Sequence, residues 1–354
     1  MKPNTEEIIT LLQQLIATES FSKKEDKTAD ILDLFLKNKG IASNRVLNNV
    51  WAVNKHYHPS KPTILLNSHH DTVRPNKGYS RGPFTPLLED GKLFGLGSND
   101  AGGPLVSLLA CFLNFYDRPD LKFNLLFAAT AEEEISGKNG IEALLPHLGV
   151  IDFGVVGEPT SMNVAIAEKG LMVLDCISKG VSGHAAREEG ENAIYNALKD
   201  IEWFRNFKFP KTSDLLGTIK MTVTLIQAGT QHNVVPDTCH YTVDVRTTDA
   251  YTNEETLSII REHITSSVHA RSLRLNPSFV AGDHPLVRAG KLVGATLYGS
   301  PTLSDQALMN FPTFKMGPGD SARSHSADEF IFIHELEEAV DLYIQLFSHF
   351  NSLL

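Results

Sequence analysis

The strongest constraint on the fold is a set of three short apolar segments, each followed closely by acidic or histidine side chains. The segments are residues 63–66, 125–128 and 153–156. Runs this short and uniformly apolar are typical of strands buried on both faces, in sheets covered by helices on each side. Residues 105–115 are an apolar stretch of helical length between the first two segments. The sequence therefore predicts an α/β fold with a mixed, mostly parallel sheet.

The pattern of the chain changes after about Gly170. Residues 221–225 and 241–245 alternate between apolar and polar side chains, as strands with one exposed face do. Helices are expected after Asn192 and after Thr252, which begins a Thr-x-x-Glu capping box. This combination predicts a small domain with an antiparallel sheet and two helices.

The order of these patterns predicts one domain inserted into another. The α/β character returns near Asp283 and continues into an amphipathic helix at the end of the chain. We expect residues 1–169 and 283–354 to form a discontinuous catalytic domain. Residues 170–282 would be the inserted α+β domain.

The charge balance argues against two kinds of partner. The chain has 42 acidic and 32 basic residues and a net charge of −10. Nucleic acids and anionic membranes are bound by clustered Lys and Arg, so neither is expected as a partner. The apolar runs are shorter than a membrane helix, the N-terminal residues lack the apolar core of a signal peptide, and the three cysteines are widely separated. We expect a cytoplasmic protein.

Five polar clusters carry the candidate chemistry, and four of them occur where α/β proteins place their sites, at or near the ends of buried strands. The clusters are His69-His70-Asp71, Asp100 in a glycine-rich run, Glu132-Glu133-Glu134, Glu158 before Pro159, and His325 followed by Asp328-Glu329. Taken singly, each has an ordinary structural explanation, because an acidic triplet is usually a solvated turn and a lone histidine is usually a hydrogen-bonded core residue.

Taken in order, the clusters resemble a known family. The succession His-x-Asp, Gly-x-Gly-Ser-x-Asp, Glu-Glu, Gly-Glu-Pro and His is similar to the aminoacylase, acetylornithine deacetylase and succinyl-diaminopimelate desuccinylase family of dinuclear zinc hydrolases. The resemblance runs from about Ser68 to Phe330 and includes residues 182–185 and 233–237. It implies a zinc-peptidase-type catalytic domain and an inserted dimerisation domain, and therefore a homodimer.

The resemblance also implies two Zn²⁺ ions per subunit, for which Co²⁺ or Mn²⁺ could substitute. His69 and Glu158 would bind one ion, Glu134 and His325 would bind the other, and Asp100 would bridge the two. Histidine nitrogen and carboxylate oxygen are ordinary zinc ligands, and a catalytic zinc site leaves one position open.

Two further side chains receive catalytic roles from the same match. Glu133 would be the general base, taking a proton from the attacking water and returning it to the departing amine. The residues Ile135-Ser136-Gly137 set this register and leave Glu132 at a variable acidic position. Asp71 would orient the ring of His69 through its second nitrogen.

The inserted domain would complete the site. By resemblance, His184 would stabilise the oxyanion from the partner subunit, although a plain turn residue is the alternative. Asn233 and Arg246 would bind substrate, since an arginine fork suits an α-carboxylate. Lys169 would add a basic contact at the hinge between the domains.

The predicted substrate is a small N-acyl-L-amino acid. The residues 167–171 look most like the acetylornithine deacetylase branch, which serves arginine biosynthesis. N-acetyl- or N-succinyl-L-ornithine or citrulline would then be hydrolysed to a carboxylate and a free amino acid. The alternatives are a dipeptidase or aminopeptidase, a succinyl-diaminopimelate desuccinylase on the same scaffold, or a binding protein without catalysis.

Overall fold

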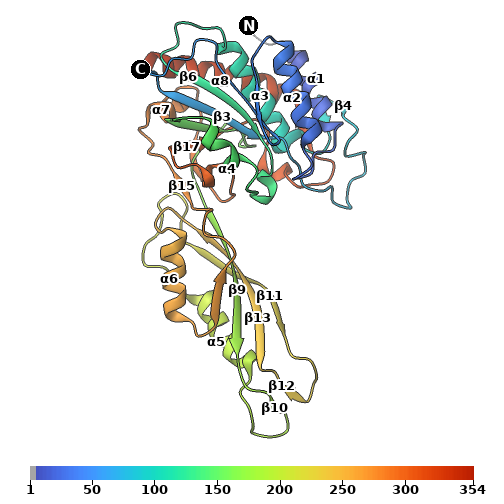
Figure 1. The fold of residues 1–354 in the computed structure, drawn as a ribbon, viewed down its shortest axis with the longest axis vertical. Coiled ribbons are helices and arrows are strands. Elements are labelled where there is room, and N and C mark those ends of the chain that lie inside the picture. Colours follow the sequence, from blue (N-terminus) through green and yellow to red (C-terminus); the bar gives the residue numbers. More distant parts are fainter. Residues whose placement is uncertain (1–4) are drawn as a thin grey trace. The chain divides into compact units, whose positions relative to one another are not determined.

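A computed structural model describes residues 5–354 and divides the chain into two compact units (Figure 1). Unit 1 contains the residues up to Ile166 together with Phe279–Tyr298 and Ser304–Leu354, and unit 2 contains Ala167–Ser278 and Gly299–Leu303. The inserted unit thus begins slightly before residue 170 and ends slightly before residue 282. The short return at Gly299–Leu303 was not predicted, because apolar periodicity marks strands and helices but not which unit a loop packs against.

The sheet of unit 1 confirms the predicted mixed, mostly parallel arrangement. Its central strands run parallel in the order β6 (Asn124–Thr130), β3 (Thr63–His69), β7 (Phe153–Val156) and β17 (Thr313–Lys315). On one side, β2 (Asn49–Val53) pairs antiparallel with β6, and β1 (Asn44–Val46) pairs antiparallel with β2. On the other side, β8 (Val164–Glu168) pairs antiparallel with β17. Strands β15 (Ser278–Phe279) and β16 (Leu297–Ser300) both pair with β8. Every residue of β3, β6 and β7 is buried, as their uniformly apolar segments require.

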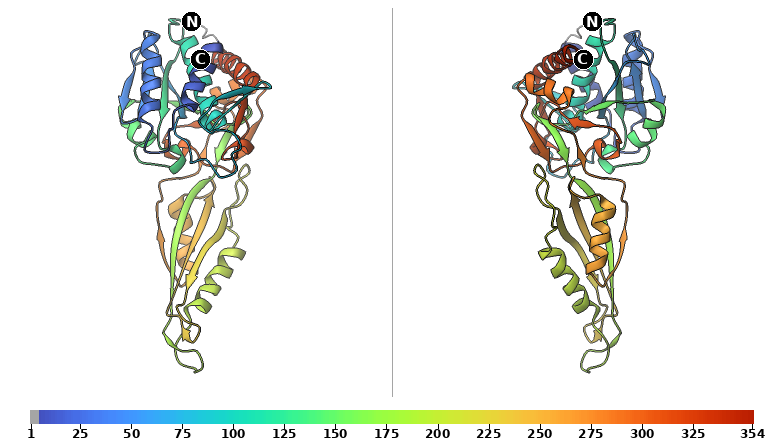
Figure 2. Two further views of the ribbon diagram at one scale, coloured as in Figure 1. Left: turned by 90° about the vertical axis from the view of Figure 1, so that its right-hand side faces the viewer. Right: turned by 90° about the vertical axis from the view of Figure 1, so that its left-hand side faces the viewer.

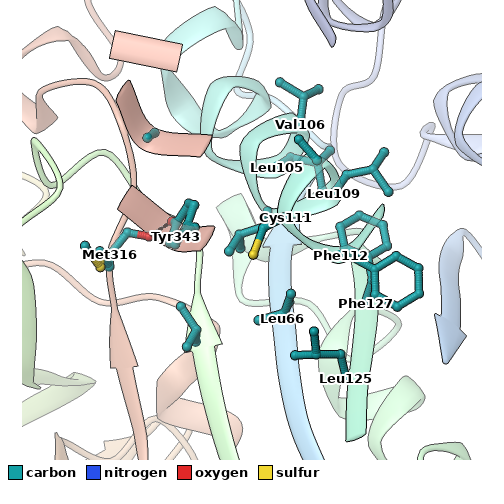
Figure 3. Packing of buried hydrophobic residues seen from close by; sticks show 14 of the residues in the cluster. Leu66, Leu105, Val106, Leu109, Cys111, Phe112, Leu125, Phe127, Met316 and Tyr343 are labelled. Atoms are coloured by element: carbon teal, nitrogen blue, oxygen red, sulfur yellow. Dashed lines mark hydrogen bonds between the residues drawn. The ribbon is translucent and has the colours of Figure 1, made fainter. Parts of the chain in front are cut away.

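Helices cover both faces of this sheet. The larger core lies under α1 (Thr5–Ile16), α2 (Asp26–Asn38), α3 (Gly103–Phe115), α7 (Pro285–Leu292) and α8 (Ile333–Leu353), and the smaller core lies under α4 (Ile141–Leu144). Figure 3 shows Leu66, Leu125 and Phe127 of the sheet facing Leu105, Leu109 and Phe112 of α3. The rings of Phe112 and Phe127 are 5.9 Å apart. Burying a side chain of this size stabilises the fold by about 1.5–3 kcal/mol.

Unit 2 confirms the predicted antiparallel sheet with two helices. Its strands follow the order β11 (Lys220–Ala228), β13 (Thr238–Thr247), β9 (Gly170–Lys179) and β14 (Ser267–Ala270). Side chains of β9 and β13 are buried in alternation, and the buried ones share a core with α5 (Ala193–Asn206) and α6 (Asn253–His263). Both helices lie against the strands of this sheet (Figure 2). The capping box predicted at Thr252 is present at the start of α6.

Two small sheets complete the described chain: β10 (Gly183–His184) with β12 (Val234–Val235), and β4 (Leu87–Glu89), β5 (Lys92–Phe94) and β18 (Phe330–Phe332). All three cysteines are buried and free. Among residues 5–354, no helix combines the length and the apolar character that crossing a membrane requires.

Candidate metal centre

The carboxyl ends of three parallel strands bring the first site residues together. Strand β3 ends at His69, which lies opposite Thr130 at the end of β6. The short helix Glu133–Ile135 follows β6, and Glu158 is the second residue after β7. Because these strands are parallel neighbours, the side chains meet at one edge of the sheet, where α/β folds bind ligands.

The five predicted metal ligands form two groups joined by Asp100. In the first group, His69 Nε2 lies 3.2 Å from Asp100 Oδ1 and 3.9 Å from Glu158 Oε1. In the second, His325 Nε2 lies 2.9 Å from Glu134 Oε2 and 3.8 Å from Asp100 Oδ2. The two carboxylate oxygens of Asp100 thus face one histidine each. The members of each predicted pair therefore lie close together, with Asp100 between the pairs. By distance, His69 could also share an ion with Asp100 and Glu134, or with Glu133 and Glu158, so the pairing stays a prediction.

Glu133 enters the same space without belonging to the proposed ligand set. Its Oε2 lies 3.8 Å from His69 Nε2. Burial raises the pKa of Glu133 well above its usual range, and the carboxylates of Glu158 and Asp305 add to this effect against the opposing charge of His69. A carboxylate with a raised pKa is suited to accept and return a proton near neutral pH.

Asp71 lies at the second ring nitrogen of His69, where it was predicted, and it also contacts the turn that carries Glu133. The ring Nδ1 of His69 lies 3.0 Å from the backbone oxygen of Asp71 and 3.5 Å from its carboxylate. The carboxylate also accepts hydrogen bonds from the backbone N–H groups of Glu133 and Glu134, at 3.0 and 3.2 Å, and from the hydroxyl of Ser22. Asp71 therefore holds both the ring of His69 and the turn that carries the base.

The residues present fit a pair of divalent metal ions. Glu158 Oε1 is buried and has no hydrogen-bond partner among the residues that the structure describes. Burial, followed by repulsion from Asp100, raises the pKa of Glu158 to about 8, and the hydrogen bond to Glu134 raises the pKa of His325 to about 9. Crowded carboxylates and imidazoles with such shifts form a site that cations would stabilise, and these donors suit zinc and related metals.

Two buried acidic residues next to the site were not predicted. Asp305 accepts hydrogen bonds from the Asn67 amide of β3 and the Thr130 hydroxyl of β6, both at 2.8 Å. Glu329 accepts three backbone hydrogen bonds from the loop that carries Asp100. Only the position of Glu329, four residues after His325, could have drawn attention to it, and no local pattern singles out Asp305.

Two of the predicted residues of unit 2 lie together at one place. His184 in β10 pairs with Val234 in β12, and the N–H of Ala185 donates to the carbonyl oxygen of Asn233. The side chain of His184 is exposed. Its Nδ1 accepts a hydrogen bond from the backbone N–H of Ala186.

The other two residues of unit 2 lie near each other as well. Arg246 pairs through two nitrogens with Asp244 on the same strand, at 2.9 and 3.1 Å. Lys169 Nζ donates to the carbonyl oxygen of Thr218. Burial, with the nearby charges of Lys220 and Arg246, lowers the pKa of Lys169. The guanidinium fork predicted for a substrate carboxylate is thus partly engaged by Asp244.

The two pairs lie near opposite ends of strand β9. Arg246 pairs with Leu171 at the start of β9, whereas His184 follows shortly after Lys179 at its end. At about 3.3 Å per residue, these points on β9 are roughly 25 Å apart. Within unit 2 of one chain, the four predicted residues therefore do not converge on one small substrate.

Comparison with known proteins identifies relatives of this chain. The sequence profile of Peptidase family M20/M25/M40 matches residues 65–349. A succinyl-diaminopimelate desuccinylase of Rickettsia bellii is 26% identical over 374 aligned positions, which cover 94% of each protein.

Solved structures show the same fold. The aminopeptidase PepT from Bacillus cereus superposes with a TM-score of 0.79 at 19% identity and covers 99% of this chain and 100% of its own. A dinuclear metal-binding peptidase of the M20 family from Bacillus subtilis superposes with a TM-score of 0.75 at 17% identity, with 99% of each chain covered. The predicted family is thereby confirmed, and the predicted acetylornithine deacetylase branch stays a prediction. This chain belongs to peptidase family M20/M25/M40 and is a metal-dependent amidohydrolase.

Proposed function

We propose that the protein hydrolyses the amide of a small N-acyl-L-amino acid to a carboxylate and a free amino acid. The observation that carries the reaction type is the position of Glu133, whose carboxylate lies 3.8 Å from His69, has 11% of its side chain exposed and is outside the proposed ligand set. The acyl-amino-acid substrate is supported by the motif resemblance and by the relative from Rickettsia bellii, whose name specifies a desuccinylase.

We assign the metal ligands as predicted. His69 and Glu158 would hold one ion, Glu134 and His325 the other, and Asp100 would contact both. Zinc is the proposed metal because imidazole and carboxylate donors suit it. When bound, two divalent ions would supply Lewis-acid chemistry at the amide carbonyl.

The residues of the chain would then carry the protons. Glu133 would take a proton from the attacking water and deliver it to the departing amine nitrogen. Asp71 accepts a hydrogen bond from the Glu133 backbone N–H, which helps to fix the turn that carries the base. His184 would donate a hydrogen bond to the oxyanion, and Arg246, Asn233 and Lys169 would bind the substrate carboxylate and amide.

A substrate panel tests the proposal. N-acetyl- and N-succinyl-ornithine, the same derivatives of citrulline, and N-succinyl-diaminopimelate would be compared with simple dipeptides in the presence of zinc. We expect the highest kcat/KM on an N-acyl amino acid. A preference for ornithine or citrulline derivatives would support a role of the enzyme in arginine biosynthesis. A preference for succinyl-diaminopimelate would support the desuccinylase alternative. Hydrolysis of dipeptides alone would overturn the proposal in favour of a peptidase.

We further propose a homodimer formed through unit 2. Strand β11 lies at the edge of its sheet and exposes Leu225 (63%) and Ile226 (56%). Helix α5 of the same unit exposes Tyr195 and Leu198. An unpaired strand edge with large apolar side chains is a surface that a second chain can cover.

Charging this edge should break the dimer. In Leu225→Lys/Ile226→Lys, repulsion and loss of apolar contact should halve the mass measured by light scattering during gel filtration. The control is Val150→Lys in unit 1, because Val150 is 80% exposed and lies outside the proposed interface. If the double variant kept the mass of the wild-type protein, the dimer interface would have to lie elsewhere.

Subunit mixing tests whether His184 acts on the partner. His184→Ala and Glu133→Ala should each be nearly inactive as homodimers. If subunits exchange at random, half of the dimers are hybrids. Each hybrid then has one site with both residues intact, and activity should return to about one quarter of wild type. Activity that stays at the level of the separate variants would show that His184 does not act in trans.

A further inference from the structure

Glu329 is a buried carboxylate that makes several hydrogen bonds to one loop of the metal centre. Its side chain belongs to no predicted ligand pair, and only 1% of the residue is exposed. Its backbone oxygen accepts a hydrogen bond from the N–H of Gly95, at the start of the loop that leads to Asp100. Residue 329 therefore contacts this loop through both its main chain and its side chain.

The carboxylate of Glu329 accepts hydrogen bonds from three backbone N–H groups of that loop. Its Oε1 accepts from Asn99 at 2.8 Å and from Asp100 at 2.9 Å, and its Oε2 accepts from Gly97 at 3.1 Å. The two oxygens of one carboxyl group offer enough acceptor positions for all three N–H groups. One side chain thus fixes the peptide from which the Asp100 carboxylate projects.

The same downstream segment also carries His325. The carbonyl oxygen of His325 accepts a hydrogen bond from the Asn76 amide. Asp328 accepts hydrogen bonds from the backbone N–H groups of Ser80 and Arg81. These contacts hold the segment in place. Because Glu329 at its end binds the loop of Asp100, residues 325–329 connect one proposed ligand, His325, to the loop of another.

We propose that Glu329 is a positioning residue of the metal centre, which directs the Asp100 carboxylate so that one oxygen faces His69 and the other faces His325. The inference rests on the proposed ligand set and is independent of which amide is hydrolysed. A side chain in this role sets the affinity of the site for metal, because partners that orient a ligand typically change affinity by about 10- to 100-fold when they are replaced.

The replacement Glu329→Gln tests this role. Glutamine has one side-chain oxygen, so it cannot accept from Gly97 and from the Asn99–Asp100 pair together. Metal would be removed with a chelator, and Zn²⁺ would be titrated back in competition with a chromophoric chelator. We expect zinc affinity to fall by about 10- to 100-fold. Wild-type affinity in the folded variant would overturn the proposal.

Asp200→Asn in unit 2 is the matched control. Asp200 is also a buried carboxylate that accepts backbone N–H groups, from Thr265 at 3.1 Å and Ser266 at 2.9 Å. Both variants should lower the melting temperature of the metal-free protein, but only Glu329→Gln should weaken zinc binding. Equal loss of zinc affinity in both variants would mean that general destabilisation explains the effect, and the proposal would fail.

The variant Glu329→Asp distinguishes the effect of the position of the carboxylate from the effect of its charge. It also replaces the glutamine variant in the test if that variant does not fold. Aspartate keeps the negative charge but is one methylene shorter, so it cannot reach all three N–H groups from the same backbone position. A positioning role predicts weakened zinc binding here too. Wild-type zinc affinity in Glu329→Asp would overturn the proposal, because the charge alone would then suffice.

Discussion

Replacing Glu133 with glutamine should lower kcat by about 100- to 10,000-fold while both metal ions remain bound. Glutamine has nearly the shape of glutamate but cannot accept a proton at neutral pH. The side chain is outside the proposed ligand set, and Asp71 holds only its backbone N–H, which glutamine retains. The loss should therefore appear in kcat, with metal content by elemental analysis unchanged.

The neighbouring Glu132→Gln variant is the control for this assignment. The Glu132 carboxylate is buried and accepts from the Asn139 amide at 2.8 Å. The Glu132→Gln substitution should therefore lower the stability of the protein more than its kcat. If Glu132→Gln lost activity and Glu133→Gln kept it, the general base would be the wrong member of the triplet. If Glu133→Gln lost its metal, Glu133 would be a ligand.

Binding of metal to the metal-free protein at pH 7 should release protons and stabilise the fold. With its pKa raised to about 8 by burial, and then by Asp100, Glu158 is mostly protonated at pH 7 in the metal-free protein. The surrounding carboxylates also raise the pKa of His69 well above its usual value despite its burial, which favours the protonated ring. Metal ligands must be deprotonated, so binding displaces these protons.

Calorimetry in buffers of different ionisation enthalpy measures the number of protons released. Glu158→Gln should release fewer protons than wild type, because glutamine has no proton to lose. Identical heats in all buffers, after correction for dilution, would contradict the prediction. At a free metal concentration 1,000 times the dissociation constant, bound metal adds about 4 kcal/mol to the free energy of unfolding.

The stability of the metal-free protein should also depend on pH in a defined direction. The folded pKa of Glu158, about 8, lies above its ordinary value of 4.5. The stability that this carboxyl contributes is therefore complete below pH 4.5 and is lost as the pH rises through 8. Between pH 6 and 9 the melting temperature of wild type should fall more than that of Glu158→Gln, and bound metal should remove most of this difference.

Much of the candidate site could be predicted because its residues occur in short motifs at strand ends. The segments that became β3, β6 and β7 are uniformly apolar, and parallel pairing aligns their carboxyl ends. His69 is the last residue of β3, and Glu133, Glu134 and Glu158 follow within a few residues of the ends of β6 and β7. Local sequence and one topological rule therefore place them together. The motif order then added Asp100 and His325, which no strand pattern could have placed.

The supporting contacts could not be predicted because they join residues that are far apart in sequence. Asp305 contacts Asn67 from 238 positions away, and Glu329 contacts the Asp100 backbone from 229 positions away. The pairing of Arg246 with Asp244 was also missed. Alternation along the strand places both side chains on one face, but whether they meet depends on rotamers and burial.

The sequence alone determined the α/β architecture with its inserted unit, and it predicted the set of chemical groups at the candidate site. It did so because apolar periodicity records burial, and ligand motifs record the donor atoms that a metal needs. Only the tertiary structure decided which buried carboxylate supports which ligand, and that His184 and Asn233 lie near the opposite end of β9 from Lys169 and Arg246. The physical reason is that hydrogen-bond partners and distances arise from packing between distant segments.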